Sequence, residues 1–142
     1  MALETKTRIL DAAEQLFAEH GFSDTSMRDI TTAADVNLAA VNYHFGSKES
    51  LFIEVMKRRT IPINRERIRR LDALEVDAGT KPVTAEDLVR AFLSPMLEFR
   101  SGWTESDSRD SFLKLVGRSH TELDPTLHAK LVGQYEEVIK RF

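Results

Sequence analysis

Apolar residues recur at helical spacing along most of the chain, and no segment alternates in the way that is typical of a strand. The first helical pattern runs from Thr5 to His20 and ends at Gly21, a residue type common just past a helix end. Its apolar face consists of Ile9, Ala13, Leu16 and Phe17. A second pattern reaches Ala34, and Ser26 with Asp29 three residues later predicts a capping box at its start.

A tight turn separates this second helix from a third one that is only about two turns long. Residues 35–37 have the composition of a turn, because Asp35 tolerates unusual backbone angles and Asn37 is a favoured N-cap residue. The third helix should run from Leu38 to about Phe45. Only Val41 and Phe45 have the spacing of residues that pack against other helices, so the rest of this helix is predicted to face solvent.

The pattern of apolar residues after residue 46 predicts further helices. Ser47 can cap a fourth helix whose pattern continues past Pro62, where we predict a kink or break because proline lacks a backbone N–H and crowds the preceding turn. A loop is predicted over residues 77–82. Further helices are expected from Thr84, over about 109–121, and from Pro125 onward.

Together these patterns predict an all-α protein. Residues 1–50 form an N-terminal unit of three helices, with the tight turn between the second and the third. The fourth helix links this unit to the later helices, so that residues 51–142 form a second unit.

The composition excludes several classes of function. The absence of cysteine excludes disulfides, thiolate nucleophiles and cysteine-based zinc fingers. There is also no glycine-rich phosphate loop and no paired His-carboxylate motif, so we predict no enzyme activity and no cofactor. No apolar run reaches the length of a membrane span and no signal peptide is evident, which favours a cytoplasmic protein without membrane contact.

The outward residues of the third predicted helix suit contact with base pairs. Small side chains let a backbone approach base edges, an alanine methyl can touch thymine, and an asparagine can pair with adenine. A short helix after a tight turn also fits the major groove of DNA, which is about 12 Å wide. The residues in question are Leu38, Ala39, Ala40, Asn42, Tyr43 and His44.

The charge distribution limits how such a helix could hold DNA. The net charge is −3, and residues 1–50 hold four basic and eight acidic side chains, so contact with DNA must rely on a few placed groups. The basic run from Lys57 to Arg70 is more typical of a solvated helix face than of a DNA clamp.

Four segments of the first third of the chain resemble the DNA-binding head of TetR-family transcriptional repressors, in the same order and at the same spacing. They are Arg8–Ala13, Leu16–Phe22, Thr25–Ile30 and Val41–Glu49. The resemblance implies a helix-turn-helix repressor that binds a palindromic operator in double-stranded DNA as a homodimer. It implies base contacts for Leu38, Ala39, Ala40 and Asn42, phosphate contacts for Tyr43, His44 and Lys48, and contact with phosphate or a base for Ser26 and Arg28.

Several of these roles have structural alternatives. The ring of His44 can pack beneath the third helix, and Arg28 can pair with Asp24 or Asp29 on the surface. Two positions depart from the family pattern: Asp35 stands where glycine is frequent, and Asn42 stands where an aromatic residue is common. The second departure predicts a distinct operator preference, with Asn42 reading adenine.

The second half resembles the family's regulatory domain only in being helical. The resemblance implies that a small apolar effector binds among these helices and releases the operator. An acyl compound is expected, because residues 36–43 are similar to those of fatty-acid-responsive members. The following residues are candidates to line the pocket, although most of them are more typical of the core: Phe92, Met96, Phe99, Trp103, Phe112, Leu115, Val116 and Tyr135.

Three further expectations concern the length of the chain, an alternative function and a metal site. Family members usually continue with two more helices that form the dimer interface, so a chain whose apolar pattern is still running at Phe142 is expected to lack them. A rival interpretation is a helical protein-interaction module without ligand control. A metal site is disfavoured, because the spacing of its possible ligands crosses the helix start at Pro125; these are His120, Glu122, Asp124 and His128.

Overall fold

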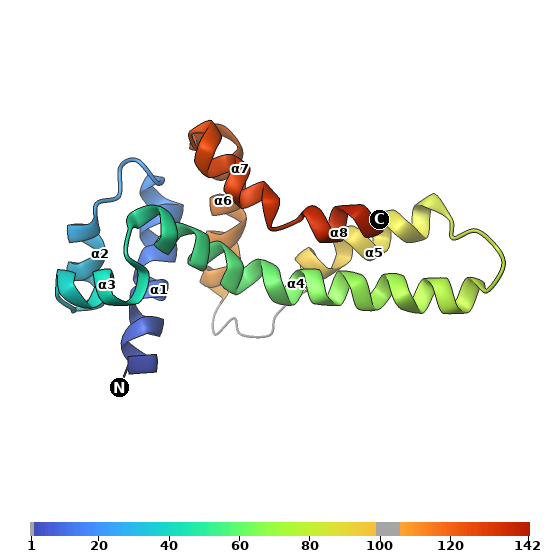
Figure 1. Ribbon diagram of the computed structural model, residues 1–142, viewed down its shortest axis with the longest axis horizontal. Helices are drawn as coiled ribbons and strands as arrows, with labels where there is room; N and C mark the ends of the chain where they lie inside the picture. Colours follow the sequence, from blue (N-terminus) through green and yellow to red (C-terminus); the bar gives the residue numbers. More distant parts are fainter. Residues whose placement is uncertain (1, 99–105) are drawn as a thin grey trace.

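The computed structural model describes residues 2–98 and 106–142, and this part of the chain is helical apart from short connections (Figure 1). The all-α prediction is therefore confirmed. The described helices are α1 (Ala2–His20), α2 (Met27–Ala34), α3 (Leu38–Phe45), α4 (Lys48–Ala78), α5 (Ala85–Glu98), α6 (Ser106–Glu122), α7 (Pro125–Gly133) and α8 (Glu136–Arg141). None of these helices is long and apolar enough to cross a membrane.

Helices α1, α2 and α3 pack together at one end of the molecule, against the first turns of α4 (Figure 1). The rings of Phe17, Phe22 and Phe52 meet at the centre of this cluster, with centroids 5.2 to 5.8 Å apart. The apolar faces predicted from the sequence are buried here, apart from Leu16, which is half-buried. The buried residues include Ile9, Ala13, Phe17, Ile30, Ala34, Val41, Phe45, Leu51, Val55 and Met56.

The turn between α2 and α3 is built from local capping bonds. At the start of α2, the Ser26 side chain accepts a hydrogen bond from the backbone of Asp29, and the Asp29 carboxylate accepts one from the backbone of Ser26. At the end of α2, Asp35 adopts the left-handed conformation with φ 53°. Arg8 of α1 then donates to the carbonyls of Ala34 and Asp35, at 2.6 and 2.9 Å. The orientation of α3 is thus held by α1 as well as by the turn.

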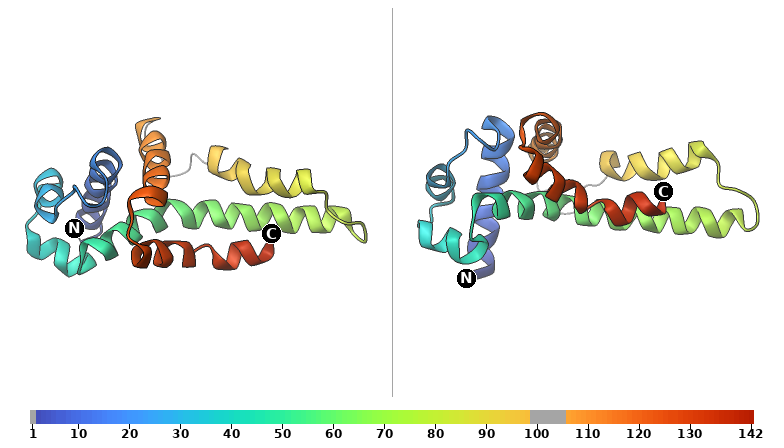
Figure 2. Two further views of the ribbon diagram at one scale, coloured as in Figure 1. Left: turned by 90° about the horizontal axis from the view of Figure 1, so that it is seen from above. Right: turned by 45° about the horizontal axis from the view of Figure 1, so that its top comes forward.

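Helix α4 spans 31 residues and connects the two ends of the molecule (Figure 1). The predicted break at Pro62 is wrong, because α4 continues through this residue. Proline costs about 3 kcal/mol inside a helix, and the burial of Thr60 and Ile63 on either side offsets this cost through packing. Helix α5 returns alongside α4, and α7 and α8 also contact it (Figure 2).

The last predicted helix is divided in two. Asp124 caps α7 as predicted, since its carboxylate accepts hydrogen bonds from the backbone of Thr126 and Leu127. The helix ends at Gly133, and α8 begins at Glu136.

Helix α6 packs against the C-terminal turn of α1. Gly21 ends α1 with φ +84°, and its N–H donates to the carbonyl of Phe17 at 2.9 Å. Arg118 of α6 donates to the carbonyl of Glu19 at 3.2 Å and forms an ion pair with Glu122. The space that a side chain at Gly21 would need is taken by the carboxylate of Glu122.

The Gly21→Ala variant tests how much the left-handed backbone at this position depends on glycine. We expect the variant to lose about 1–2 kcal/mol of unfolding free energy, the usual cost of a left-handed conformation in a residue other than glycine. The Glu122 carboxylate lies at the end of a flexible side chain and can move aside. Urea unfolding measures the loss.

Gly117→Ala on α6 is the control for this variant. A methyl group there meets no atom within 4 Å, and alanine favours a helix by roughly 0.5–1 kcal/mol over glycine. We therefore expect this control to be stabilised. Equal stability of Gly21→Ala and the wild type would contradict the argument.

Candidate functional site

Helix α3 presents most of its side chains to solvent at the outer end of the molecule (Figure 1). Within α3, Val41 and Phe45 are the buried residues, as the sequence predicted. Tyr43 is 85% exposed and Leu38 is 52% exposed. Ala39 and Asn42 are exposed as well, whereas Ala40 and His44 are half-buried. The exposed residues at positions 38, 39, 42 and 43 lie on one face, because residues three or four apart are neighbours on a helix.

Helix α2 precedes α3 in the chain, and two residues at its start, Ser26 and Arg28, are predicted to contact DNA. The Ser26 hydroxyl is engaged in the capping box, and the hydrogen bonds from the Ser26 backbone and side chain lower the pKa of Asp29. The Arg28 side chain is exposed and makes no hydrogen bond or ion pair with any residue that the structure describes, including Asp24 and Asp29. Its guanidinium is therefore accessible to a ligand in solution.

The residues after Asn42 have more constrained positions. The half-buried ring of His44 stands edge-on to the ring of Tyr43, with centroids 5.2 Å apart. The ammonium group of Lys48 donates to the carbonyls of Phe22 and Thr25, at 2.9 and 3.1 Å, and lies 4.3 Å from the centre of the Phe22 ring. These bonds use two of its three N–H groups and hold the connection between α1 and α2.

The basic run of α4 is mostly neutralised by acidic residues. Arg58 and Arg59 pair with the buried Glu14 of α1, and Arg70 pairs with Glu66 and Glu98. Hydrogen bonds from Arg69 and Arg70 lower the pKa of Glu66 to about 2. This run therefore contributes ion pairs to the fold, and the prediction of a solvated helix face is wrong for Arg59 and Arg67, which are buried.

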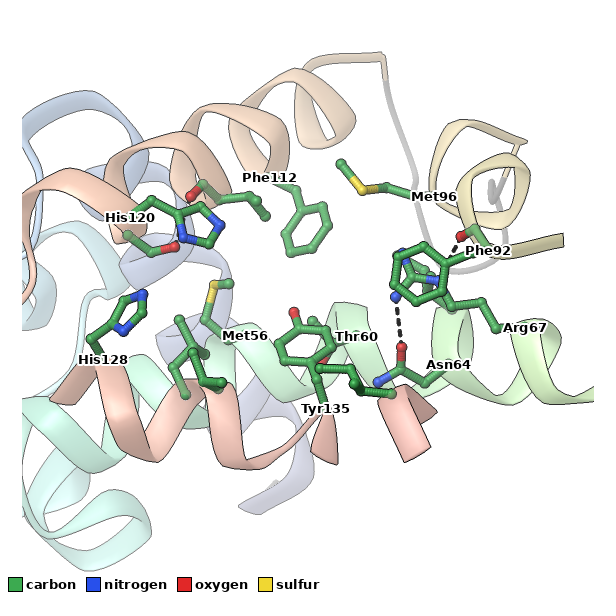
Figure 3. A pocket seen from close by; sticks show the side chains of 16 residues that line it. Met56, Thr60, Asn64, Arg67, Phe92, Met96, Phe112, His120, His128 and Tyr135 are labelled. Atoms are coloured by element: carbon green, nitrogen blue, oxygen red, sulfur yellow. Dashed lines mark hydrogen bonds between the residues drawn. The ribbon is translucent and has the colours of Figure 1, made fainter. Parts of the chain in front are cut away.

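A cavity of about 370 Å³ lies between α4, α5, α6, α7 and the start of α8 (Figure 3). Five of the predicted residues line it: Phe92, Met96, Phe112, Val116 and Tyr135. Leu115 is buried but does not line it, and Phe99 and Trp103 lie outside the described residues. The other lining residues are Met56, Thr60, Ile63, Asn64, Arg67, Ser119, His120, His128, Leu131, Val132 and Ile139.

Arg67 is the charged group of this cavity that the sequence analysis missed. Its side chain extends toward Phe92 and Asn64 (Figure 3), where Nε donates to the Phe92 carbonyl at 2.8 Å and Nη1 donates to Oδ1 of Asn64 at 2.9 Å. The guanidinium also lies 4.0 Å from the centre of the Phe92 ring. Burial lowers the pKa of Arg67 and raises that of Tyr135. The sequence could not reveal this, because the spacing of the basic residues in α4 does not distinguish the buried Arg67 from its exposed neighbours.

Two histidines lie at the other end of the cavity from Arg67 (Figure 3). The rings of His120 and His128 are 5.7 Å apart between centroids. The two acidic residues weighed with them as metal ligands point elsewhere, since Glu122 pairs with Arg118 and Asp124 caps α7. Among the described residues, no three potential ligands come together around a metal position.

The turn between α2 and α3, together with the outward face of α3, defines a helix-turn-helix protein. Residues 9–55 match the family described as "Bacterial regulatory proteins, tetR family". The N-terminal third of the chain is thus similar to this family of transcriptional regulators. The relatives that match are described as transcriptional regulators or repressors.

Curated relatives match between about a third and three quarters of the chain. The transcriptional regulator AcrR of Shigella flexneri is 44% identical over 54 residues, which are 38% of this chain and 25% of AcrR. The transcriptional repressor AcnR of Corynebacterium efficiens is 30% identical over 113 residues, 75% of this chain and 60% of AcnR. The chain thus spans a quarter to three fifths of the length of these curated relatives.

Solved structures extend the likeness to the whole chain. The crystal structure of NalD, described as the secondary repressor of the MexAB-OprM multidrug efflux pump in Pseudomonas aeruginosa, aligns with a TM-score of 0.65 and 27% identity. The alignment covers 100% of this chain and 65% of NalD. The fold of the second half is therefore also shared with NalD.

Proposed function

We propose that the protein is a DNA-binding transcriptional repressor, with residues 1–50 as its DNA-binding domain and residues 51–142 as part of its regulatory domain. The observation that carries this proposal is the outward face of α3, which is held in place by only two buried side chains. A helix committed to the core would bury a wider stripe. The names of the relatives support the same conclusion.

The residues of this surface take different parts in the proposal. Base edges are contacted from the exposed face of α3, by Leu38, Ala39, Ala40 and Asn42. Phosphates are contacted by Arg28, which makes no ion pair with the described residues, by the phenol of Tyr43, and by His44 and Lys48 at the rim. Ser26 caps α2 with its hydroxyl oxygen, and we assign its O–H group to a phosphate or a base at the start of this helix.

Selection of bound duplexes from a random pool tests the DNA-binding proposal. We expect the protein to enrich a palindrome, because a homodimer presents two copies of α3 to half-sites about 34–36 Å apart or a multiple of this distance. A selected pool that is indistinguishable from the starting pool would contradict the proposal. That result would favour a helical protein-interaction module instead.

We further propose that an apolar effector in the cavity releases the operator. Helix α6 offers a physical connection, because Val116, Ser119 and His120 line the cavity while Arg118 and Glu122 contact the end of α1. A ligand that displaces α6 would therefore bias the position of the DNA-binding helices.

An acyl compound is the effector that we propose. Fluorescence anisotropy of a labelled operator tests this, with acyl compounds compared against unrelated apolar molecules. Loss of operator binding with acyl compounds alone supports the proposal, and no shift with any acyl chain length contradicts it.

A further inference from the structure

The cavity of the second half contains a buried cation without a carboxylate partner in the described part of the chain. Arg67 is 5% exposed, and its two hydrogen bonds go to neutral acceptors, the Phe92 carbonyl and the Asn64 amide oxygen. A guanidinium has five N–H donors, so three of them make no hydrogen bond to the residues described. A buried charge of this kind is costly unless an opposite charge joins it.

The other shielded arginines of α4 differ in this respect. Arg58 pairs with Asp11 and Glu14, Arg59 pairs with Glu14, and Arg70 pairs with Glu66 and Glu98. Arg67 lies on the same helix and is as buried as Arg59, yet no carboxylate among the described residues lies within ion-pair distance of it. Among these shielded arginines of α4, the one without a described carboxylate partner is therefore the one that lines the cavity.

The rest of the cavity wall is largely apolar. Met56 and Phe112 lie between Arg67 and the histidine pair (Figure 3), and Ile63, Val116 and Leu131 also line the cavity. A volume of about 370 Å³ lies at the lower end of the range for pockets that bind small organic molecules. One end of the cavity thus offers a cation, and its body offers apolar surface.

From this arrangement we infer that the cavity binds an amphipathic organic anion, with its anionic group on the free N–H groups of Arg67 and its apolar body against the residues between α4 and α6. The ligand supplies the negative charge that no described residue places beside Arg67. As the identity of an effector, this inference rests on the proposed function. As a binding property it does not, because it is measured without DNA.

Isothermal titration calorimetry of the 142-residue protein with three ten-carbon compounds tests the inference. The compounds are decanoate, decan-1-ol and decyltrimethylammonium, which share an apolar chain and differ in the charge of the head group. We expect decanoate to bind roughly 10- to 150-fold more tightly than decan-1-ol, as a hydrogen bond to a charged group is worth about 1.5–3 kcal/mol. The cationic compound should bind most weakly.

Arg67→Gln is the variant for the same titration. It should lower the affinity for decanoate to about that for decan-1-ol and leave decan-1-ol binding within about threefold of the wild type. Arg65→Gln is the matched control, because Arg65 lies on the same helix, is exposed, and does not line the cavity. The control should bind all three compounds as the wild type does.

The outcomes that overturn the inference are specific. Equal affinity of the wild type for decanoate and decan-1-ol would remove the role of the charge, and an Arg67→Gln variant with unchanged decanoate affinity would remove the role of Arg67. Absence of binding by all three compounds would also refute it. Should circular dichroism show that Arg67→Gln does not fold, the comparison of the three compounds on the wild type decides the question.

Discussion

Glu14→Gln is expected to lower the unfolding free energy by about 3–5 kcal/mol, because it leaves two guanidinium groups without their shared anion in the interior. The Glu14 side chain is 4% exposed and accepts hydrogen bonds from Arg59 at 3.0 to 3.3 Å and from Arg58 at 2.9 Å. The three residues join α1 to α4. Since the helix-turn-helix rests on α1, loss of this cluster should also loosen α3.

Urea unfolding followed by circular dichroism measures this effect. Asp11→Asn is the matched control, since Asp11 pairs with the same Arg58 but its side chain is 63% exposed, and surface pairs contribute about 0–1 kcal/mol. We expect the double variant Glu14→Leu with Arg59→Met to recover most of the loss, because an apolar pair replaces the buried Glu14–Arg59 pair while Arg58 keeps Asp11 as its partner. A loss below about 1 kcal/mol for Glu14→Gln would show that water reaches the cluster.

Local sequence signals predicted the helix-turn-helix end of the molecule well. The capping box of Ser26 and Asp29, the turn at Asp35 and the start of α3 at Leu38 all depend on residues within a few positions of one another. Such interactions can be identified from spacing alone. The exposed face of α3 followed in the same way, because only two of its residues had the spacing of core positions.

Contacts between residues far apart in the sequence could not be predicted from local spacing. Glu14 on the predicted first helix looked like any exposed acid, since its partners Arg58 and Arg59 lie 44 and 45 residues further along the chain. Arg67 belonged to a run that looked solvated, and only the packing of α5 against α4 buries it. Pro62 misled for a related reason, because tertiary packing holds α4 together where the local rule predicts a break.

The second large effect concerns the reading of bases by Asn42. Its side chain is exposed on α3 between Leu38 and Tyr43 and makes no hydrogen bond with the described residues. Asparagine pairs bidentately with adenine in the major groove, and such a pair discriminates against other bases by about 1–3 kcal/mol. We therefore expect Asn42→Ala to weaken binding to the selected operator by roughly 5- to 150-fold.

The decisive observation is the pattern across operator variants rather than the loss alone. At one base pair of each half-site, Asn42→Ala should bind all four possible pairs about equally, whereas the wild type should prefer the one with adenine. Tyr43→Phe is the matched control, because removal of a phosphate contact should lower the affinity for every operator by a similar factor. If Asn42→Ala behaved like this control, with all variants weakened in proportion, Asn42 would be a positioning residue and the adenine preference would have to come from DNA shape or from Ala39 and Ala40 beside it.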